Sequence, residues 1–135
     1  MAPARITGVN HVTLVVADLP RSVRFYCDVL GCELRAQWAQ GAYLDAGTLW
    51  LCLEHGDPDA RTDDTHLALS CPPDDFSALA QRIASNARQW KENRSEGESV
   101  YFLDPDGHKL ELHLGDLASR LAHYRNSPPD GFRET

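Results

Sequence analysis

The sequence repeats one order of secondary-structure signals, and this duplication restricts the fold more than any single motif does. In the first copy, an alternating run rich in β-branched residues, 9–16, predicts a buried strand. Asp18 and Pro20 are typical of a helix start, and Gly31 ends the helical spacing that follows. Three strand-like runs then predict an antiparallel meander: 32–38, 42–46 and 48–53. The first copy is therefore predicted to be a β-α-β-β-β unit.

The second copy begins after a polar linker, 55–64, for which we expect no regular structure. A strand from Thr65 opens on a histidine as the first strand does, helical spacing covers 74–86, and a strand-like run covers 87–93. Two alternating runs flank the sequence DPDG at 104–107, where proline and glycine favour a tight hairpin turn. The two copies predict an α+β fold with two similar halves.

The length of the chain favours one domain, residues 1–135, with modules at 7–55 and 65–116. A further helix is predicted at 117–126, because apolar residues recur there at helical spacing before a Ser-Pro-Pro stop. With 42% hydrophobic residues, the chain can bury a real core.

The net charge of −7 disfavours nucleic acid and anionic membranes as partners. An anionic substrate would need locally clustered cations. The chain has no leader-like segment and no apolar stretch of about 18 residues, so we expect no membrane span. Its cysteines lack CxxC spacing and suit a reducing compartment, which predicts a cytoplasmic protein: Cys27, Cys32, Cys52 and Cys71.

The duplication gives meaning to two histidines. His11 and His66 open equivalent strands, and Glu111 lies on the last strand of the second module. Two imidazoles and a carboxylate suit a divalent metal such as Mn²⁺, Fe²⁺ or Zn²⁺ acting as a Lewis acid. An isolated strand-end histidine is more often satisfied by backbone, but matched positions in two copies favour the metal. His113 would share a strand face with Glu111 and is the competing ligand.

An oxygen-rich loop, 93–99, precedes the hairpin that carries Glu111. Its asparagine and serines offer hard oxygen donors that could hold an ion, and its glycine allows a tight path. A solvated loop beside an ordinary edge hairpin is the alternative interpretation.

The tandem modules, with NH at one strand start, TH at the other and GHKLELH near the end, resemble the vicinal oxygen chelate superfamily. WKENRSEGES followed by YFLDPDGHKLELHLGDL resembles its fosfomycin-resistance glutathione transferases of the FosA type. The resemblance covers residues 7–126. It implies a glyoxalase-like fold with curled mixed sheets, and a metal-dependent enzyme that adds the thiol of glutathione to the epoxide of fosfomycin and so confers antibiotic resistance.

The resemblance also implies roles for individual residues. The metal ligands, for Mn²⁺, would be His11, His66 and Glu111. The K⁺ ligands would be Asn93, Ser95, Gly97, Ser99 and Glu111. The substrate would be held by Thr13, Trp50, Lys91, Ser95, Tyr101 and Arg120. The catalytic set would be Thr13, Tyr43 and Arg120, with the tyrosine near the thiol of glutathione. The protein would be a homodimer in which each site takes His11 from one chain and the other two metal ligands from its partner.

The chemistry of fosfomycin fits these residue types. A phosphonate epoxide is a dianion with a strained C–O bond, so a metal at the oxirane oxygen would stabilise the developing alkoxide. Lys91, Arg94 or Arg120 would offset the phosphonate charge while the thiolate attacks carbon. Without the resemblance, Tyr43 and Trp50 would be interpreted as core or interface aromatics, and the helical arginine as a solvated side chain.

Some positions depart from the family pattern, and others indicate which reaction and which thiol within the family the chain uses. Asp64 and Leu67 stand where relatives carry aromatic residues. Hydrolytic members use a glutamate base, and 39–41 offers none, which favours thiol transfer. Thr13 stands where bacillithiol-using members have cysteine, which favours glutathione. The alternatives are another metal-dependent member, of glyoxalase, epimerase or dioxygenase type, and a non-enzymatic drug-binding dimer.

Overall fold

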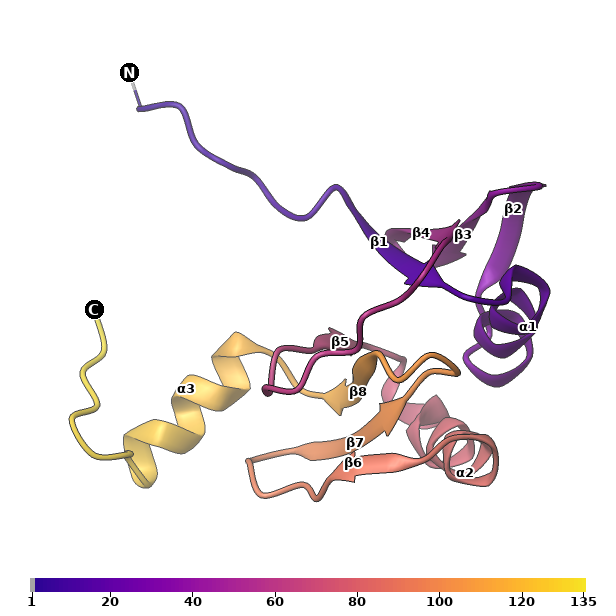
Figure 1. The fold of residues 1–135 in the computed structure, drawn as a ribbon. Coiled ribbons are helices and arrows are strands. Elements are labelled where there is room, and N and C mark those ends of the chain that lie inside the picture. The colour runs from indigo at the N-terminus through magenta and orange to yellow at the C-terminus, as the bar shows by residue number, and fades with distance from the viewer. Residues whose placement is uncertain (1) are drawn as a thin grey trace. The chain divides into compact units, whose positions relative to one another are not determined.

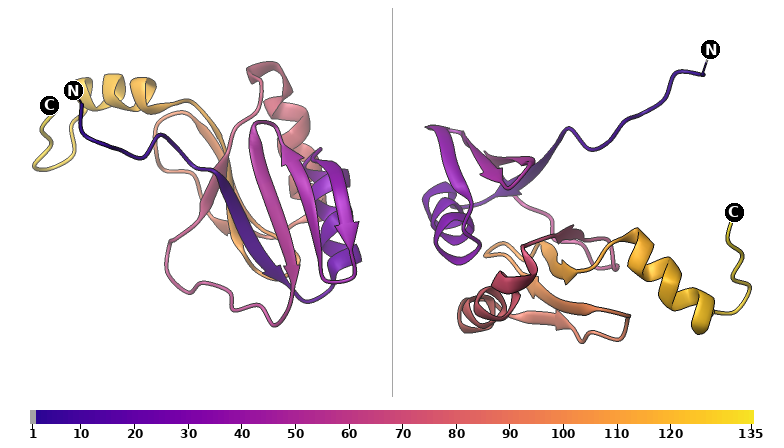
Figure 2. Two further views of the ribbon diagram at one scale, coloured as in Figure 1. Left: turned by 90° about the horizontal axis from the view of Figure 1, so that it is seen from above. Right: turned by 180° about the vertical axis from the view of Figure 1, so that it is seen from behind.

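The structure is a computed structural model that describes residues 2–135, so Met1 of the predicted single domain lies outside the described residues (Figure 1). The chain divides into two compact units, and the boundary along the sequence lies between Ala60 and Arg61, within the predicted linker. Each unit contains one four-stranded mixed sheet, and Figure 2 shows each sheet as an open, curved layer with a helix along one face.

The first unit has the predicted β-α-β-β-β order. Its elements are β1 (His11–Val16), α1 (Leu19–Arg24), a π-helical turn (Phe25–Val29), β2 (Glu33–Trp38), β3 (Gly41–Ala46) and β4 (Leu49–His55). The strand order is β1-β4-β3-β2, with β1 parallel to β4 and the other pairs antiparallel, which confirms the predicted meander. The helix packs against β3 and β4.

The ends of the first helix follow the predicted signals. The Asp18 side chain caps the helix by accepting a hydrogen bond from the backbone N–H of Arg21 at 3.1 Å. Gly31, with φ +77°, donates to the carbonyl of Cys27 at 3.1 Å and ends the helix as expected. The π-helical turn between these ends was not predicted, because spacing at three and four residues does not separate π from α geometry.

The second unit repeats the order and adds a helix. Its elements are β5 (Leu67–Leu69), a 3₁₀ turn (Pro73–Asp75), α2 (Phe76–Asn86), β6 (Gln89–Lys91), β7 (Glu98–Leu103), β8 (Lys109–Leu114) and α3 (Leu117–Asn126). The strand order β5-β8-β7-β6 matches that of the first unit, with β5 parallel to β8. The first strand is shorter than predicted, so His66 lies just before it instead of opening it.

The DPDG turn forms as predicted and sets the register of the hairpin. The Asp104 carboxylate accepts hydrogen bonds from the backbone N–H groups of Asp106 and His108, both at 2.9 Å. Gly107 has φ +86°, which a residue with a Cβ rarely adopts. The resulting register pairs Tyr101 with Glu111. The turn therefore determines which side chains of β7 and β8 face each other.

Each unit has its own buried side chains. Tyr26, Leu44 and Leu53 are at most 1% exposed in the first unit, as are Phe102 and Leu110 in the second. Burying an aliphatic or aromatic side chain of this size contributes about 1.5–3 kcal/mol, so each sheet and its helix hold together by apolar burial. Within residues 2–135, no helix has the length and apolar character that crossing a membrane requires.

Candidate functional site

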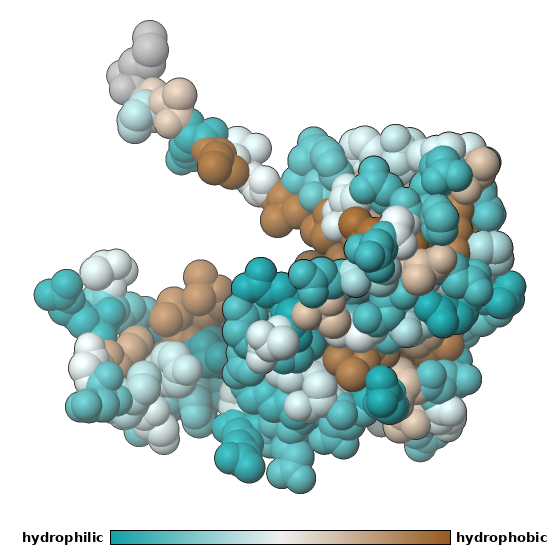
Figure 3. Space-filling model, viewed as in Figure 1, coloured by the Kyte–Doolittle hydropathy of each residue, from teal (hydrophilic) through white to brown (hydrophobic). Residues whose placement is uncertain are grey.

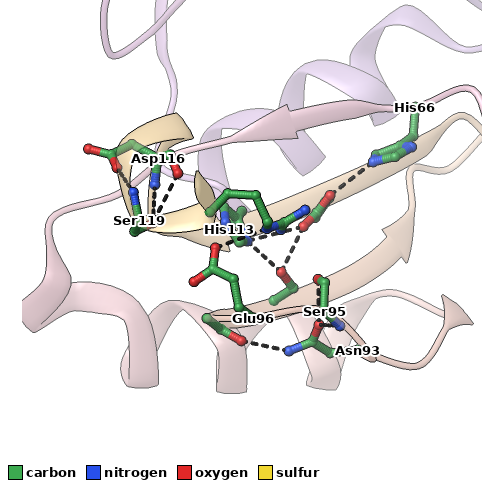
Figure 4. Close-up of polar contacts among 11 residues, drawn as sticks. His66, Asn93, Ser95, Glu96, His113, Asp116 and Ser119 are labelled. Carbon is green, nitrogen blue, oxygen red and sulfur yellow. Dashed lines mark hydrogen bonds and ion pairs between the residues drawn. The ribbon is translucent and has the colours of Figure 1, made fainter. Parts of the chain in front are cut away.

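The second unit brings a histidine and a buried carboxylate together (Figure 4). Nε2 of His66 lies 2.9 Å from Oε1 of Glu111, a residue that is 6% exposed. The other carboxylate oxygen, Oε2, accepts a hydrogen bond from Oγ of Ser99 at 2.7 Å. Nδ1 of His113 lies 2.7 Å from the same hydroxyl. Strand alternation explains the cluster, because positions two apart on β8 share a face.

The hydrogen bonds of His66 leave a place for a cation. Its Nδ1 lies 2.6 Å from the backbone carbonyl of Asp64, an acceptor, so this nitrogen carries the proton. In a neutral ring Nε2 then presents a lone pair to an oxygen of Glu111, and two acceptors at 2.9 Å need a positive charge between or on them. A histidine whose Nδ1–H is held by a carbonyl is the usual form of a metal ligand. The pair therefore fits a metal ion.

The first unit gathers four other predicted residues. His11, Thr13, Tyr43 and Trp50 line one cavity of about 400 Å³. The rings of His11 and Trp50 lie 4.5 Å apart between centroids, and those of Tyr43 and Trp50 lie 5.2 Å apart. Nδ1 of His11 lies 2.7 Å from Oδ1 of Asn10, so Nε2 is the ring nitrogen that faces no partner within this hydrogen bond. The predicted metal histidine and the predicted epoxide and thiol contacts thus share one cavity.

Within residues 2–135, no three His, Cys, Asp or Glu side chains are grouped so that they could hold a metal. His66 and Glu111 belong to the second unit, and His11 belongs to β1 of the first.

The predicted K⁺ loop is folded on itself. Asn93 donates from its side chain to the carbonyl of Gly97 at 2.9 Å, and its Oδ1 accepts from both N and Oγ of Ser95 at 3.1 Å. Gly97 has φ +76°, and a Cβ there would lie 2.7 Å from the carbonyl oxygen of Leu114. The oxygen donors are therefore close together, next to the strand that carries Ser99.

The predicted phosphonate-binding cations both have acidic neighbours. Nζ of Lys91 lies 5.3 Å from the centre of the Tyr101 ring and 3.8 Å from a carboxylate oxygen of Asp64. Nε of Arg120 donates to Oε1 of Glu96 at 3.1 Å, and this hydrogen bond raises the pKa of the arginine. Glu96 was not among the predicted site residues. Nothing in its sequence spacing relates it to Arg120, because the contact depends on the shape of the loop.

Comparisons with known proteins show which proteins this chain is similar to. Residues 8–112 match the family model of the Glyoxalase/Bleomycin resistance protein/Dioxygenase superfamily. The chain is 48% identical over 133 residues to the glutathione transferase FosA of Serratia marcescens, covering 94% of both chains. It is also similar to the fosfomycin resistance protein FosX of Listeria monocytogenes, with a TM-score of 0.79 and 30% identity over 89% of this chain and all of that one.

At least two of the similar structures contain ligands. One is a mutant of the same FosX protein complexed with Mn(II) and 1S,2S-dihydroxypropylphosphonic acid. Its TM-score is 0.76 at 28% identity, over 87% of this chain and 99% of that one. A protein with this fold therefore binds both a metal ion and a three-carbon phosphonate.

Proposed function

Because the chain belongs to the Glyoxalase/Bleomycin resistance protein/Dioxygenase superfamily and, within it, to the fosfomycin-resistance proteins, we propose that it transfers the thiol of glutathione to the epoxide of fosfomycin. The observation that carries this proposal is the contact of His66 with the buried carboxylate of Glu111 in a chain that is 48% identical to a glutathione transferase. The pair argues against a drug-binding protein that lacks metal ligands.

The metal site would be completed by a second subunit. His66 and Glu111 of one chain, with His11 of its partner, would hold Mn²⁺ in a homodimer. In the single chain Ile6 and Val9 are 90% and 76% exposed, and Figure 3 shows apolar spheres among hydrophilic ones on the arm before β1. Large exposed apolar side chains on an extended arm support a segment that packs against another chain.

Other residues of the chain would bind the substrates and orient them. When bound, Mn²⁺ supplies a Lewis acid for the oxirane oxygen. Lys91 and Arg120 offset the phosphonate charge, and an arginine side chain is cationic at every working pH. Thr13 donates from the cavity of the first unit, where Tyr43 orients the incoming thiolate and Trp50 excludes water from the epoxide. Ser95 and Tyr101 are the neutral donors of the second unit.

Addition of water to the epoxide is the second candidate reaction. Glu54 lines the same cavity as His11, so a carboxylate is available there to activate water. The prediction of no base applied only to 39–41, whereas Glu54 lies on β4.

A single assay separates the two reactions. Purified protein with Mn²⁺ and K⁺ is expected to consume glutathione and fosfomycin in equal amounts, measured by thiol titration and by ³¹P NMR of the phosphonate. A Glu54→Gln variant is expected to retain this activity. Loss of fosfomycin without loss of thiol would instead identify water addition, and loss of neither would refute both candidates.

The loop at Asn93–Gly97 gives a prediction about monovalent ions. K⁺ held by the loop and by Ser99 would add positive charge beside the phosphonate, so turnover should fall in K⁺-free buffer and Na⁺ should restore it poorly. Ser99→Ala is expected to lose K⁺ activation while keeping turnover at saturating Mn²⁺. Saturation is needed because the Ser99 hydroxyl also donates to Glu111. Equal wild-type turnover with and without K⁺ would contradict a functional K⁺ site.

A further inference from the structure

The contact between Glu96 and Arg120 joins two segments of the second unit. Glu96 lies in the loop between β6 and β7, and Arg120 lies in the first half of α3. Oε1 of the glutamate is 3.1 Å from Nε of the arginine. The side chains are 13% and 30% exposed, respectively, so solvent screens this pair less than an ordinary surface ion pair.

The loop holds the carboxylate of Glu96 in place. The hydrogen bond from Asn93 to the carbonyl of Gly97 closes the loop around it. On the side of α3, a Cβ on Gly115 would lie 3.0 Å from Oγ of Ser119 and 3.7 Å from Oε1 of Glu96. The carboxylate of Glu96 therefore lies beside Gly115, just before α3.

The helix holds the backbone of Arg120 equally firmly. Asp116 and Ser119 form a reciprocal capping box, in which each side chain accepts from the other residue's backbone N–H at 2.9 and 3.0 Å (Figure 4). The backbone N–H of Arg120 donates to the carbonyl of Asp116 at 3.1 Å. Its guanidinium lies 5.9 Å from the centre of the Tyr124 ring. The helix thus fixes the backbone of Arg120. Glu96 and Tyr124 then fix the direction of its side chain.

We propose that Glu96 is a positioning residue that holds Arg120 in the orientation that binds the phosphonate. A carboxylate is an unexpected neighbour in an anion site, because it cancels part of the positive charge there. The contact uses Nε, however, and an arginine has further N–H groups on its two terminal nitrogens, which can form a fork toward an oxyanion. The inference rests on the proposed function, since it assigns Arg120 to the phosphonate.

Steady-state kinetics of Glu96→Ala and Glu96→Gln test the proposal. Loss of a hydrogen bond to a charged group should raise the KM for fosfomycin by about tenfold in Glu96→Ala. The kcat and the KM for glutathione should stay within about twofold, because the arginine binds ground state and transition state alike. Glu96→Gln keeps an acceptor oxygen for Nε and should recover part of the loss. Glu98→Gln, at an exposed neighbouring position, is the matched control and should behave as wild type.

A double variant checks that the effect passes through the guanidinium. In an Arg120→Ala background, Glu96→Ala should have no further effect on the KM, because no guanidinium remains to be held. A fall in the KM of Glu96→Ala or Glu96→Gln would show instead that the carboxylate competes with substrate, and would overturn the proposal. Unchanged KM values in an active enzyme would also overturn it.

Fosfomycin binding by calorimetry to the Mn²⁺-loaded dimer separates this inference from the thiol-transfer proposal. If the wild type binds fosfomycin without consuming glutathione, and Glu96→Ala binds about tenfold more weakly, positioning stands and thiol transfer fails. If the wild type neither binds nor turns over fosfomycin, both fail.

Discussion

Glu111→Gln is expected to lower the affinity for Mn²⁺ by about tenfold or more and to reduce turnover in the same proportion at limiting metal. The substitution keeps the shape of the side chain but removes the negative charge that would balance the ion. It also places an amide where Ser99 now donates to Oε2 at 2.7 Å and where Nε2 of His66 lies 2.9 Å from Oε1. Mn²⁺ titration followed by electron paramagnetic resonance measures the change, and circular dichroism checks that the fold persists.

His113→Ala is the matched control for this prediction. His113 contacts the hydroxyl of Ser99 and lies 3.4 Å from Oε2 of Glu111, so its loss should disturb the carboxylate without removing a ligand. We expect a smaller loss of Mn²⁺ affinity than in Glu111→Gln. The opposite ranking, with unchanged affinity in Glu111→Gln, would transfer the ligand role to the histidine.

Mixing two inactive variants is expected to restore activity if each metal site takes residues from two chains. His11→Ala and Glu111→Ala homodimers should each lack a complete site. Random exchange of equal amounts gives half heterodimers, each with one intact site of two, so about a quarter of the wild-type activity should return. Turnover before and after subunit exchange measures it.

The control for this experiment places both substitutions in one chain. Mixing the His11→Ala, Glu111→Ala double variant with a third inactive variant, His66→Ala, can form no site with three ligands, and should restore nothing. If the first pair of variants gains no activity although heterodimers are detected by native mass spectrometry, shared ligation is wrong.

The sequence predicted the features that depend on local chemistry and on periodicity. The duplicated β-α-β-β-β order followed from strand alternation and helical spacing, and the DPDG turn from the backbone preferences of proline and glycine. Alternation also places Thr13 on the same face as His11, and both line the cavity of the first unit.

Other features depend on geometry that spacing does not determine. The approach of Glu96 to Arg120 needs the closed shape of the loop, and the 3.8 Å distance between Lys91 and Asp64 needs the path of the linker. The length of β5 was also overestimated, since only Leu67–Leu69 pair with β8 although β8 extends further at both ends. These contacts between segments are specified only by the folded chain.

The strand order has a consequence for synthesis on the ribosome. In each unit the first strand to leave the ribosome pairs only with the last one. β1 pairs only with β4, and β5 pairs only with β8. The antiparallel strands β2, β3 and β4 can pair as they emerge. The first strand, β1, cannot pair until β4 has been made, and this non-local pairing is slow to form. Each sheet is therefore completed by its last strand. The linker after β4 marks the shortest nascent chain that holds all the strands of the first sheet.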